Sequence, residues 1–187
     1  LIVVKTDGKL RPVDIKGSEE SVKIGKGAEF VEWKKEVGDK VIKDDAIASL
    51  KPASGSDFEV FASRDGVVVA TVEGLKSGDK LEDVLENENL ATIGDKLRPL
   101  EVGETQQAVH VPTAHMTFKK WEKLVGEKVT SGVTIAILED QHLHMVNVTA
   151  GRAGIVVQEQ DLKEDDYIDN LVPDSPSMAG VSAQVIA

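Results

Sequence analysis

Apolar and polar residues alternate along this chain in short segments of strand length. The segments AEFVEW (28–33), AIASL (46–50) and FEVFA (58–62) contain aromatic or branched residues at strand-like spacing, and GVVVATV (66–72) is a continuous β-branched run. Turns with Gly and an acid, such as EVGDKV (36–41), separate them. No segment combines helix start and stop signals. The pattern therefore predicts an all-β protein of many short strands.

One twelve-residue segment of the sequence occurs twice, with substitutions. FVEWKKEVGDKV (30–41) returns as FKKWEKLVGEKV (118–129), 88 residues later, with seven of twelve positions identical. At the same offset EVFASRDGVVV (59–69) matches NVTAGRAGIVV (147–157). Such a register indicates a tandem duplication rather than a solenoid, which usually needs about three repeats or more. We predict a first domain over 1–92, a second over 93–172 and an extended tail over 173–187, with the boundary near NLATIGD (89–95).

Composition narrows the function classes. The chain has 22 basic and 33 acidic residues, a net charge of −11, which disfavours nucleic-acid binding and favours solubility or a basic partner surface. It has no Cys, so disulfides and thiolate chemistry are excluded. No apolar run approaches the ~18–20 residues of a membrane span, so no membrane association is predicted. The chain starts at Leu1 without Met, so N-terminal trimming is expected and a removed signal stays open.

The segment HLH is the main candidate for metal chemistry. His142 and His144 would point to one side of a strand, and neutral imidazoles in this arrangement can bind Zn, Ni or Cu. Two ligands are insufficient, so further donors would be needed, drawn from His110, His115, Glu139 or Asp140. We expect solvated or interface histidines instead, because an isolated pair gives many false positives.

Other motifs favour structural roles. Trp33 and Trp121 occupy the same place in both copies and are expected to pack a core or edge rather than a ligand. The acidic stretch EQDLKEDD (159–166) lacks the spacing of a calcium loop and predicts a solvated turn, and 73–89 predicts a polar hairpin. No triad order, nucleophile elbow or P-loop occurs, so neither catalysis nor a cofactor is predicted.

The order strand, Trp, Gly-acid-Lys-Val turn, hairpin and Gly turn resembles the biotinyl/lipoyl attachment domains. VHVPTAHMTFKKWEKLVGEKV (109–129) is close to that family's opening pattern, whereas VKIGKGAEFVEWKKEVGDKV (22–41) lacks its Pro and Met. At the end of the hairpin, Ser63 and Gly151 stand where the family has Pro. The resemblance implies two tandem lipoyl/biotinyl-like barrel-sandwich domains of about 80 residues each.

The resemblance also implies where a modified lysine would lie. In the family this Lys precedes the turn Gly by eleven residues, which gives Gly55 in the first copy and Leu143 in the second. Neither has an amine for biotin or lipoate. Lys51 lies four residues away from the expected position, and the second tip, EDQHLHM (139–145), has no Lys.

These observations predict a non-catalytic structural or interaction protein, an accessory subunit of a large assembly such as a virion decoration or capsid-stabilising protein. It would bind protein partners, form a homo-oligomer and be located in a virion or the cytoplasm. The alternative is a degenerate carrier or docking protein related to lipoyl or biotin carrier domains, and a periplasmic adaptor is disfavoured by the short tips. The apolar ends LIVV (1–4) and VSAQVIA (181–187) are expected to close the barrels, or else to join subunits.

Overall fold

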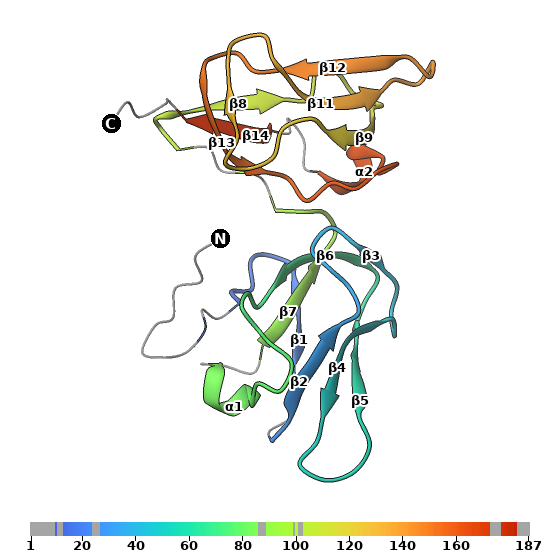
Figure 1. Ribbon diagram of the computed structural model, residues 1–187. Helices are drawn as coiled ribbons and strands as arrows, with labels where there is room; N and C mark the ends of the chain where they lie inside the picture. The colour runs from blue at the N-terminus through green and yellow to red at the C-terminus, as the bar shows by residue number, and fades with distance from the viewer. Residues whose placement is uncertain are drawn as a thin grey trace, which may run out of the picture. The chain divides into compact units, whose positions relative to one another are not determined.

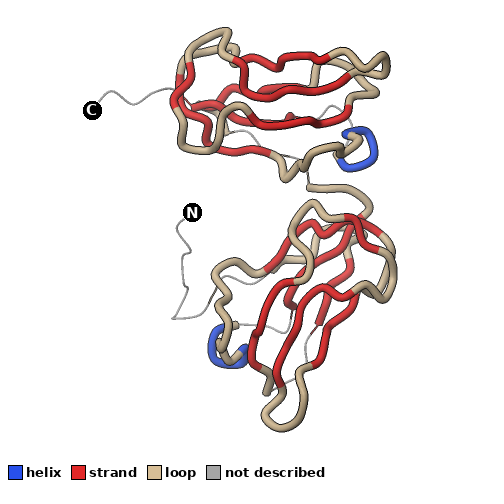
Figure 2. The backbone as a smooth tube through the Cα atoms, turned by 45° about the vertical axis from the view of Figure 1, so that its right-hand side comes forward, coloured by secondary structure: helices blue, strands red, loops and turns tan. Residues whose placement is uncertain are grey.

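In the computed structural model the regular secondary structure consists of short antiparallel strands and two short helices, joined by loops and turns (Figures 1 and 2). It describes residues 10, 13–23, 27–85, 89–98, 100, 103–172 and 177–182. The chain divides into two compact units, Leu1–Lys96 and Leu97–Ala187. The predicted all-β class is confirmed.

Among its described residues, the first unit contains seven short strands and one helical turn. They are β1 (Glu20–Lys23), β2 (Glu29–Trp33), β3 (Lys40–Val41), β4 (Ala46–Lys51), β5 (Phe58–Phe61), β6 (Gly66–Thr71), α1 (Leu81–Val84) and β7 (Asn89–Gly94). One sheet has the strand order β1-β7-β6-β3, and the other has the order β2-β4-β5. The first and last strands of the unit are therefore neighbours, and β4 and β5 form a hairpin.

The second unit repeats this arrangement element by element. It contains β8 (Gln106–His110), β9 (Thr117–Trp121), β10 (Lys128–Val129), β11 (Thr134–Glu139), β12 (Met145–Thr149), β13 (Gly154–Glu159), α2 (Ile168–Leu171) and β14 (Ser177–Ser182). Its sheets have the orders β8-β14-β13-β10 and β9-β11-β12. Two halves with the same element order and strand pairing agree with a tandem duplication.

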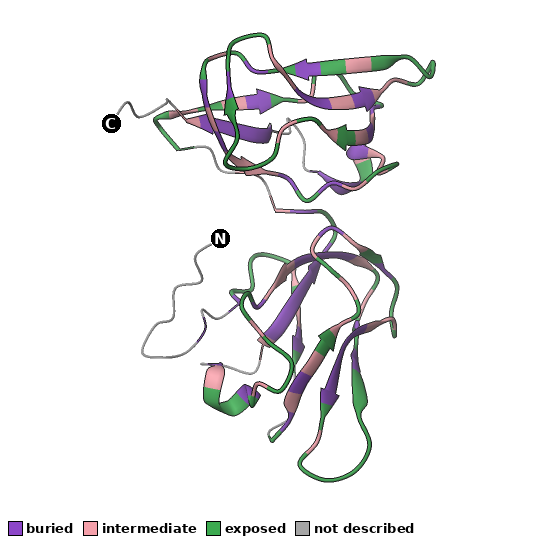
Figure 3. Cartoon of the chain, viewed as in Figure 1, coloured by how far each residue is buried: buried purple, intermediate pink, exposed green. Residues whose placement is uncertain are grey.

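The two cores use equivalent residues. Phe30 and Phe118, Ile47 and Ile135, and Leu50 and Leu138 are buried at positions 88 residues apart (Figure 3). The Trp that both repeats share is half-buried in each unit and tilted against the Phe three residues earlier, with ring centroids 5.2 Å apart for Phe30–Trp33 and 5.1 Å apart for Phe118–Trp121. The two tryptophans therefore pack against the edge of each core, as predicted.

Two short helices were not predicted. Residues 73–89, expected to form a polar hairpin, contain two turns and α1, and the equivalent segment of the second unit contains α2. Leu81 and Ile168 are each buried at the first helical residue, and the backbone N–H of each donates to the carbonyl of Ala28 or Met116, at 3.0 Å in both. Four-residue helices are too short for an apolar period, so the sequence carries no helix signal there.

The expected domain boundary is a core strand. Residues 89–94 form β7, which pairs with both β1 and β6, and Leu90, Ala91 and Ile93 are fully buried. The unit ends after this strand, at Lys96.

Part of the expected C-terminal tail likewise belongs to the sheet of the second unit. Residues 177–182 are extended, as predicted, but they form β14 between β8 and β13 instead of a linker. Met178, Ala179 and Val181 are buried there, so this segment is an inner strand of the four-stranded sheet in the second unit. Residues 1–4 and 183–187, for which a barrel-closing or subunit-joining role is predicted, lie outside the described residues.

Candidate functional site

The two hairpin tips are the candidate sites to inspect, because the resemblance predicted from the sequence would place a modified lysine there. The β4–β5 and β11–β12 hairpins keep the same register, with Leu50 opposite Phe58 and Leu138 opposite Val146. Gly55 and Leu143, the two positions that counting assigned to the lysine, therefore occupy equivalent places. Lys51 is the exposed last residue of β4, opposite Glu29, and lies before the tip.

Asp140 organises the second tip. Its backbone N–H donates to His144 O at 2.9 Å, and its carbonyl accepts the N–H of Leu143 at 3.0 Å. Its Oδ1 accepts the backbone N–H groups of His142 at 2.8 Å and of His144 at 2.9 Å. These N–H donors, that of His144 first, hold the pKa of the Asp140 carboxyl below its usual range. The tip is consequently a fixed turn.

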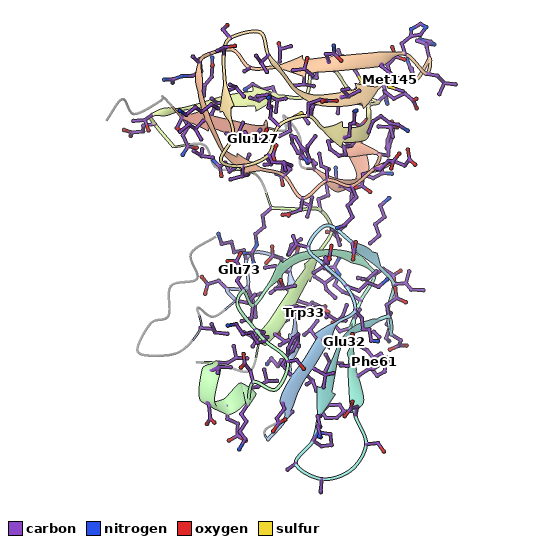
Figure 4. All side chains as sticks on the ribbon, viewed as in Figure 1. Glu32, Trp33, Phe61, Glu73, Glu127 and Met145 are labelled. Carbon is purple, nitrogen blue, oxygen red and sulfur yellow. The ribbon has the colours of Figure 1, made fainter. Side chains whose placement is uncertain are left out.

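Leu143 is held by this turn in an unfavourable conformation. Its φ is +66°, in the left-handed region that leucine seldom adopts, and its side chain is 74% exposed. Met145, at the base of the tip, is 58% exposed (Figure 4). In the first repeat Gly55 takes the equivalent position with φ +107°, where a glycine is unstrained. The second repeat thus presents an apolar side chain at its own tip at a conformational cost.

Replacement of Leu143 by glycine is therefore expected to stabilise the isolated protein, by about 0.5–1 kcal/mol, because it removes the left-handed strain. Urea unfolding followed by circular dichroism measures this change. Gln141→Gly in the same turn is the matched control, since Gln141 has no positive φ and should gain nothing. A Leu143→Gly variant less stable than Gln141→Gly would show that the leucine has a folding role.

The histidines do not form a metal site with the residues described. His142 and His144 lie in the turn instead of on a strand, and their ring centroids are 6.4 Å apart. His144 Nδ1 is 3.7 Å from Asp140 Oδ2. Among the described residues no group of three or more His, Asp or Glu side chains could hold a metal ion, and this includes the stretch 159–166 that was weighed for calcium.

His115 belongs to a different cluster, beside α2. Its Nδ1 lies 2.8 Å from Tyr167 Oη and 3.4 Å from Asp169 Oδ2, and its backbone N–H donates to Asp169 Oδ2 at 3.1 Å. Burial, together with the charge of Asp169, raises the pKa of the Tyr167 hydroxyl. From the sequence, His115 was considered only as an additional metal ligand, because its two partners, Tyr167 and Asp169, lie more than 50 residues later in the chain.

Glu159 is a half-buried acid where a solvated turn was expected. It ends β13, and its Oε2 is buried without a hydrogen-bond partner in the described structure. Burial raises the pKa of Glu159 to about 7, the backbone N–H of Val125 partly offsets this, and the charge of Glu127 adds to it. Gln160 and Leu162 are buried too, so the prediction is wrong for the start of the acidic stretch.

Glu159→Gln is expected to stabilise the protein above pH 7 and to have little effect at pH 4. The folded-state pKa lies above the unfolded value, so the wild type loses stability as pH rises from about 4.5 to 7 and its Glu159 ionises. The gain should be about 1 kcal/mol, because partial solvation screens much of the shift. Denaturant unfolding at both pH values measures it, and Glu127→Gln should give a smaller gain of the same sign. A gain that is equal at both pH values would contradict an ionisation effect.

No protein-family model, curated protein or solved structure matches this chain. Within the described residues, no helix has the length and apolar character needed to cross a membrane.

Proposed function

We propose that this protein is a non-catalytic structural or interaction protein that uses two degenerate lipoyl-like barrels as a rigid scaffold. Its role would be that of an accessory subunit of a large assembly, such as a virion decoration or capsid-stabilising protein, in homo-oligomeric form. Two curled sheets per repeat, with adjacent first and last strands, are compatible with a flattened barrel-sandwich. The acidic surface suits a basic protein partner better than nucleic acid.

The observation that carries this proposal is the second hairpin tip. The fold keeps the hairpin and its Asp140-stabilised turn, but it places Leu143 where the resemblance would require an amine. An exposed leucine in a strained conformation does not stabilise the isolated chain. Backbone strain of this kind is typically retained at functional sites, such as a contact with a binding partner. A rigid, apolar tip of this kind is suited to insert into a partner's pocket.

Intact and native mass of the protein from its natural source test the proposal. An unmodified chain in a defined oligomer or larger particle is expected. Recombinant Leu143→Gly protein, returned to the same assembly, should incorporate poorly although it is at least as stable as wild type. A monomeric native mass, or incorporation unaffected by Leu143→Gly, would count against the assembly role.

The alternative is a degenerate carrier or docking protein, and the exposure of Lys51 near the first tip is the observation that favours it. This alternative predicts a lipoyl or biotinyl mass addition that disappears in Lys51→Arg. Such an addition would replace the structural proposal with the carrier one.

A further inference from the structure

A cavity of ≈ 440 Å³ opens beside α1 in the first repeat. Gly27, Ala28 and Glu29 line it where β2 begins, and Lys80, Glu82 and Asp83 line it at α1. Ala53, from the hairpin tip, completes the lining. Three carboxylates and one ammonium make the lining net negative, and the volume lies within the ~300–1,000 Å³ typical of small-ligand sites.

The second repeat shows which residues are equivalent. The backbone N–H of Leu81 donates to Ala28 O, and that of Ile168 donates to Met116 O, at 3.0 Å in each repeat. Isolated bridges join Glu29 to Lys80 and Thr117 to Tyr167. Gly27 therefore corresponds to His115, Lys80 to Tyr167, and Glu82 to Asp169.

In the second repeat an imidazole, that of His115, lies at the corresponding position. His115 has the same left-handed backbone as Gly27, with φ +64° against +81°. Its ring reaches Tyr167 Oη and the Asp169 carboxylate, so a nitrogen group that can carry positive charge lies on the acid that corresponds to Glu82. The fold thus contains one example of the chemistry that this position accepts.

The first repeat leaves the same place open. Among the described residues other than its chain neighbours, a Cβ at Gly27 would have only Glu82 Oε1 within 4 Å, at 3.5 Å, an ordinary contact. No ion pair joins Glu29, Glu82 or Asp83 to another residue within the described ranges. The space that corresponds to the imidazole is therefore accessible from outside in the first repeat, and its three carboxylates outnumber the one described cation of the lining, Lys80.

We propose that this first-repeat cavity binds a guanidinium or a similar nitrogen cation, supplied by an arginine side chain or by a free small amine. A planar guanidinium donates several hydrogen bonds in a fixed fork, which suits two adjacent carboxylates such as Glu82 and Asp83. The methyl groups of Ala28 and Ala53 provide small apolar walls for a methylene stem. The site goes beyond the assembly role and does not depend on it, because it rests on the cavity and on the second repeat.

Backbone amide NMR of the full chain, titrated with agmatine, tests the proposal, and neutral pentanamide is the control probe. Agmatine should shift the amides of Gly27, Glu82 and Asp83, and pentanamide should not. A short peptide with one arginine separates the two sources: tighter binding than agmatine indicates a side chain, and weaker binding indicates a free amine. Shifts spread evenly over acidic residues in both repeats would overturn the site.

Two variants make the test specific. Gly27→His should place the second repeat's imidazole into the cavity and weaken agmatine binding by about tenfold or more. Glu82→Gln, an isosteric change at an exposed residue that should not affect folding, should weaken it by a similar factor. Asp169→Asn, the matched change in the second repeat, should leave agmatine binding unchanged. Unaltered binding in both Gly27→His and Glu82→Gln would disprove the proposal.

Discussion

Replacement of Gly154 by alanine is expected to destabilise the second unit by about 3 kcal/mol or more, since a buried backbone collision is a severe form of overpacking. A Cβ at Gly154 would lie 1.7 Å from Ser182 O and 2.9 Å from the carbonyl carbon of the same residue. Both atoms belong to the backbone of β14, which pairs with β13 and β8 and has little freedom to move. Relief therefore requires the two strands to separate.

Gly66→Ala in the first unit should have the same sign and a smaller effect. A Cβ there would lie 2.4 Å from Gly94 O, on β7, and 2.9 Å from the Ile93 Cγ2 atom, so the collision is less close. Its φ of +157° adds a further cost for any residue with a side chain. Both repeats therefore need a glycine for the same reason, the close approach of their last strand.

Urea unfolding, followed by circular dichroism, measures both changes. Gly103→Ala is the matched control, because the three nearest atoms to a Cβ there all belong to the flexible side chain of Gln106, at 3.5 Å or more. The control should change the free energy of unfolding by less than about 0.5 kcal/mol. A Gly154→Ala variant as stable as the control would mean that β14 does not approach β13 as closely as described.

The sequence predicted local features well and close approaches poorly. Gly66 was placed at the start of the run GVVVATV (66–72), and it does begin β6, but the residue it must accommodate lies 28 positions later, at Gly94. β14 escaped prediction for a related reason: SMAGVS (177–182) shares only one identity with NLATIG (89–94). What the two strands share is continuous burial, of residues 90–94 in β7 and 178–181 in β14, and that burial depends on neighbouring strands that a local pattern does not show.

The candidate site shows the same division. Counting along the repeat correctly aligned Gly55 with Leu143, because the hairpins have equal length. The left-handed backbone of Leu143 depends on the hydrogen bonds to Asp140, and no propensity rule places a leucine there. Glu159 was assigned to solvent because its neighbours in the sequence are charged, whereas its real environment includes Val125 and Glu127 from a turn over 30 residues earlier.

The repeats also allow a prediction about the core that uses one unit to check the other. Ile135→Ala should lower the free energy of unfolding by about 3–4 kcal/mol, the usual cost of removing a fully buried branched side chain and leaving a cavity. Ile135 is 0% exposed, and its carbonyl accepts the N–H groups of Glu122 at 2.7 Å and Lys123 at 3.1 Å, so its backbone is fixed against collapse into the cavity. Ile47 has the same burial, and its carbonyl accepts from Lys34 at 2.8 Å and Lys35 at 3.2 Å.

Ile47→Ala should therefore cost the first unit about as much as Ile135→Ala costs the second, within about 1 kcal/mol. Ile42→Ala is the matched control: the same atoms are removed from a side chain that is 64% exposed, so the expected loss is below about 0.5 kcal/mol. Tryptophan fluorescence separates the units, with Trp33→Phe or Trp121→Phe as the background so that one indole reports each transition. Similar losses at Ile47 and Ile135 would mean that the duplicated cores are equivalent in energy as well as in position. A loss at Ile135 no larger than at Ile42 would contradict the burial on which both cores are assigned.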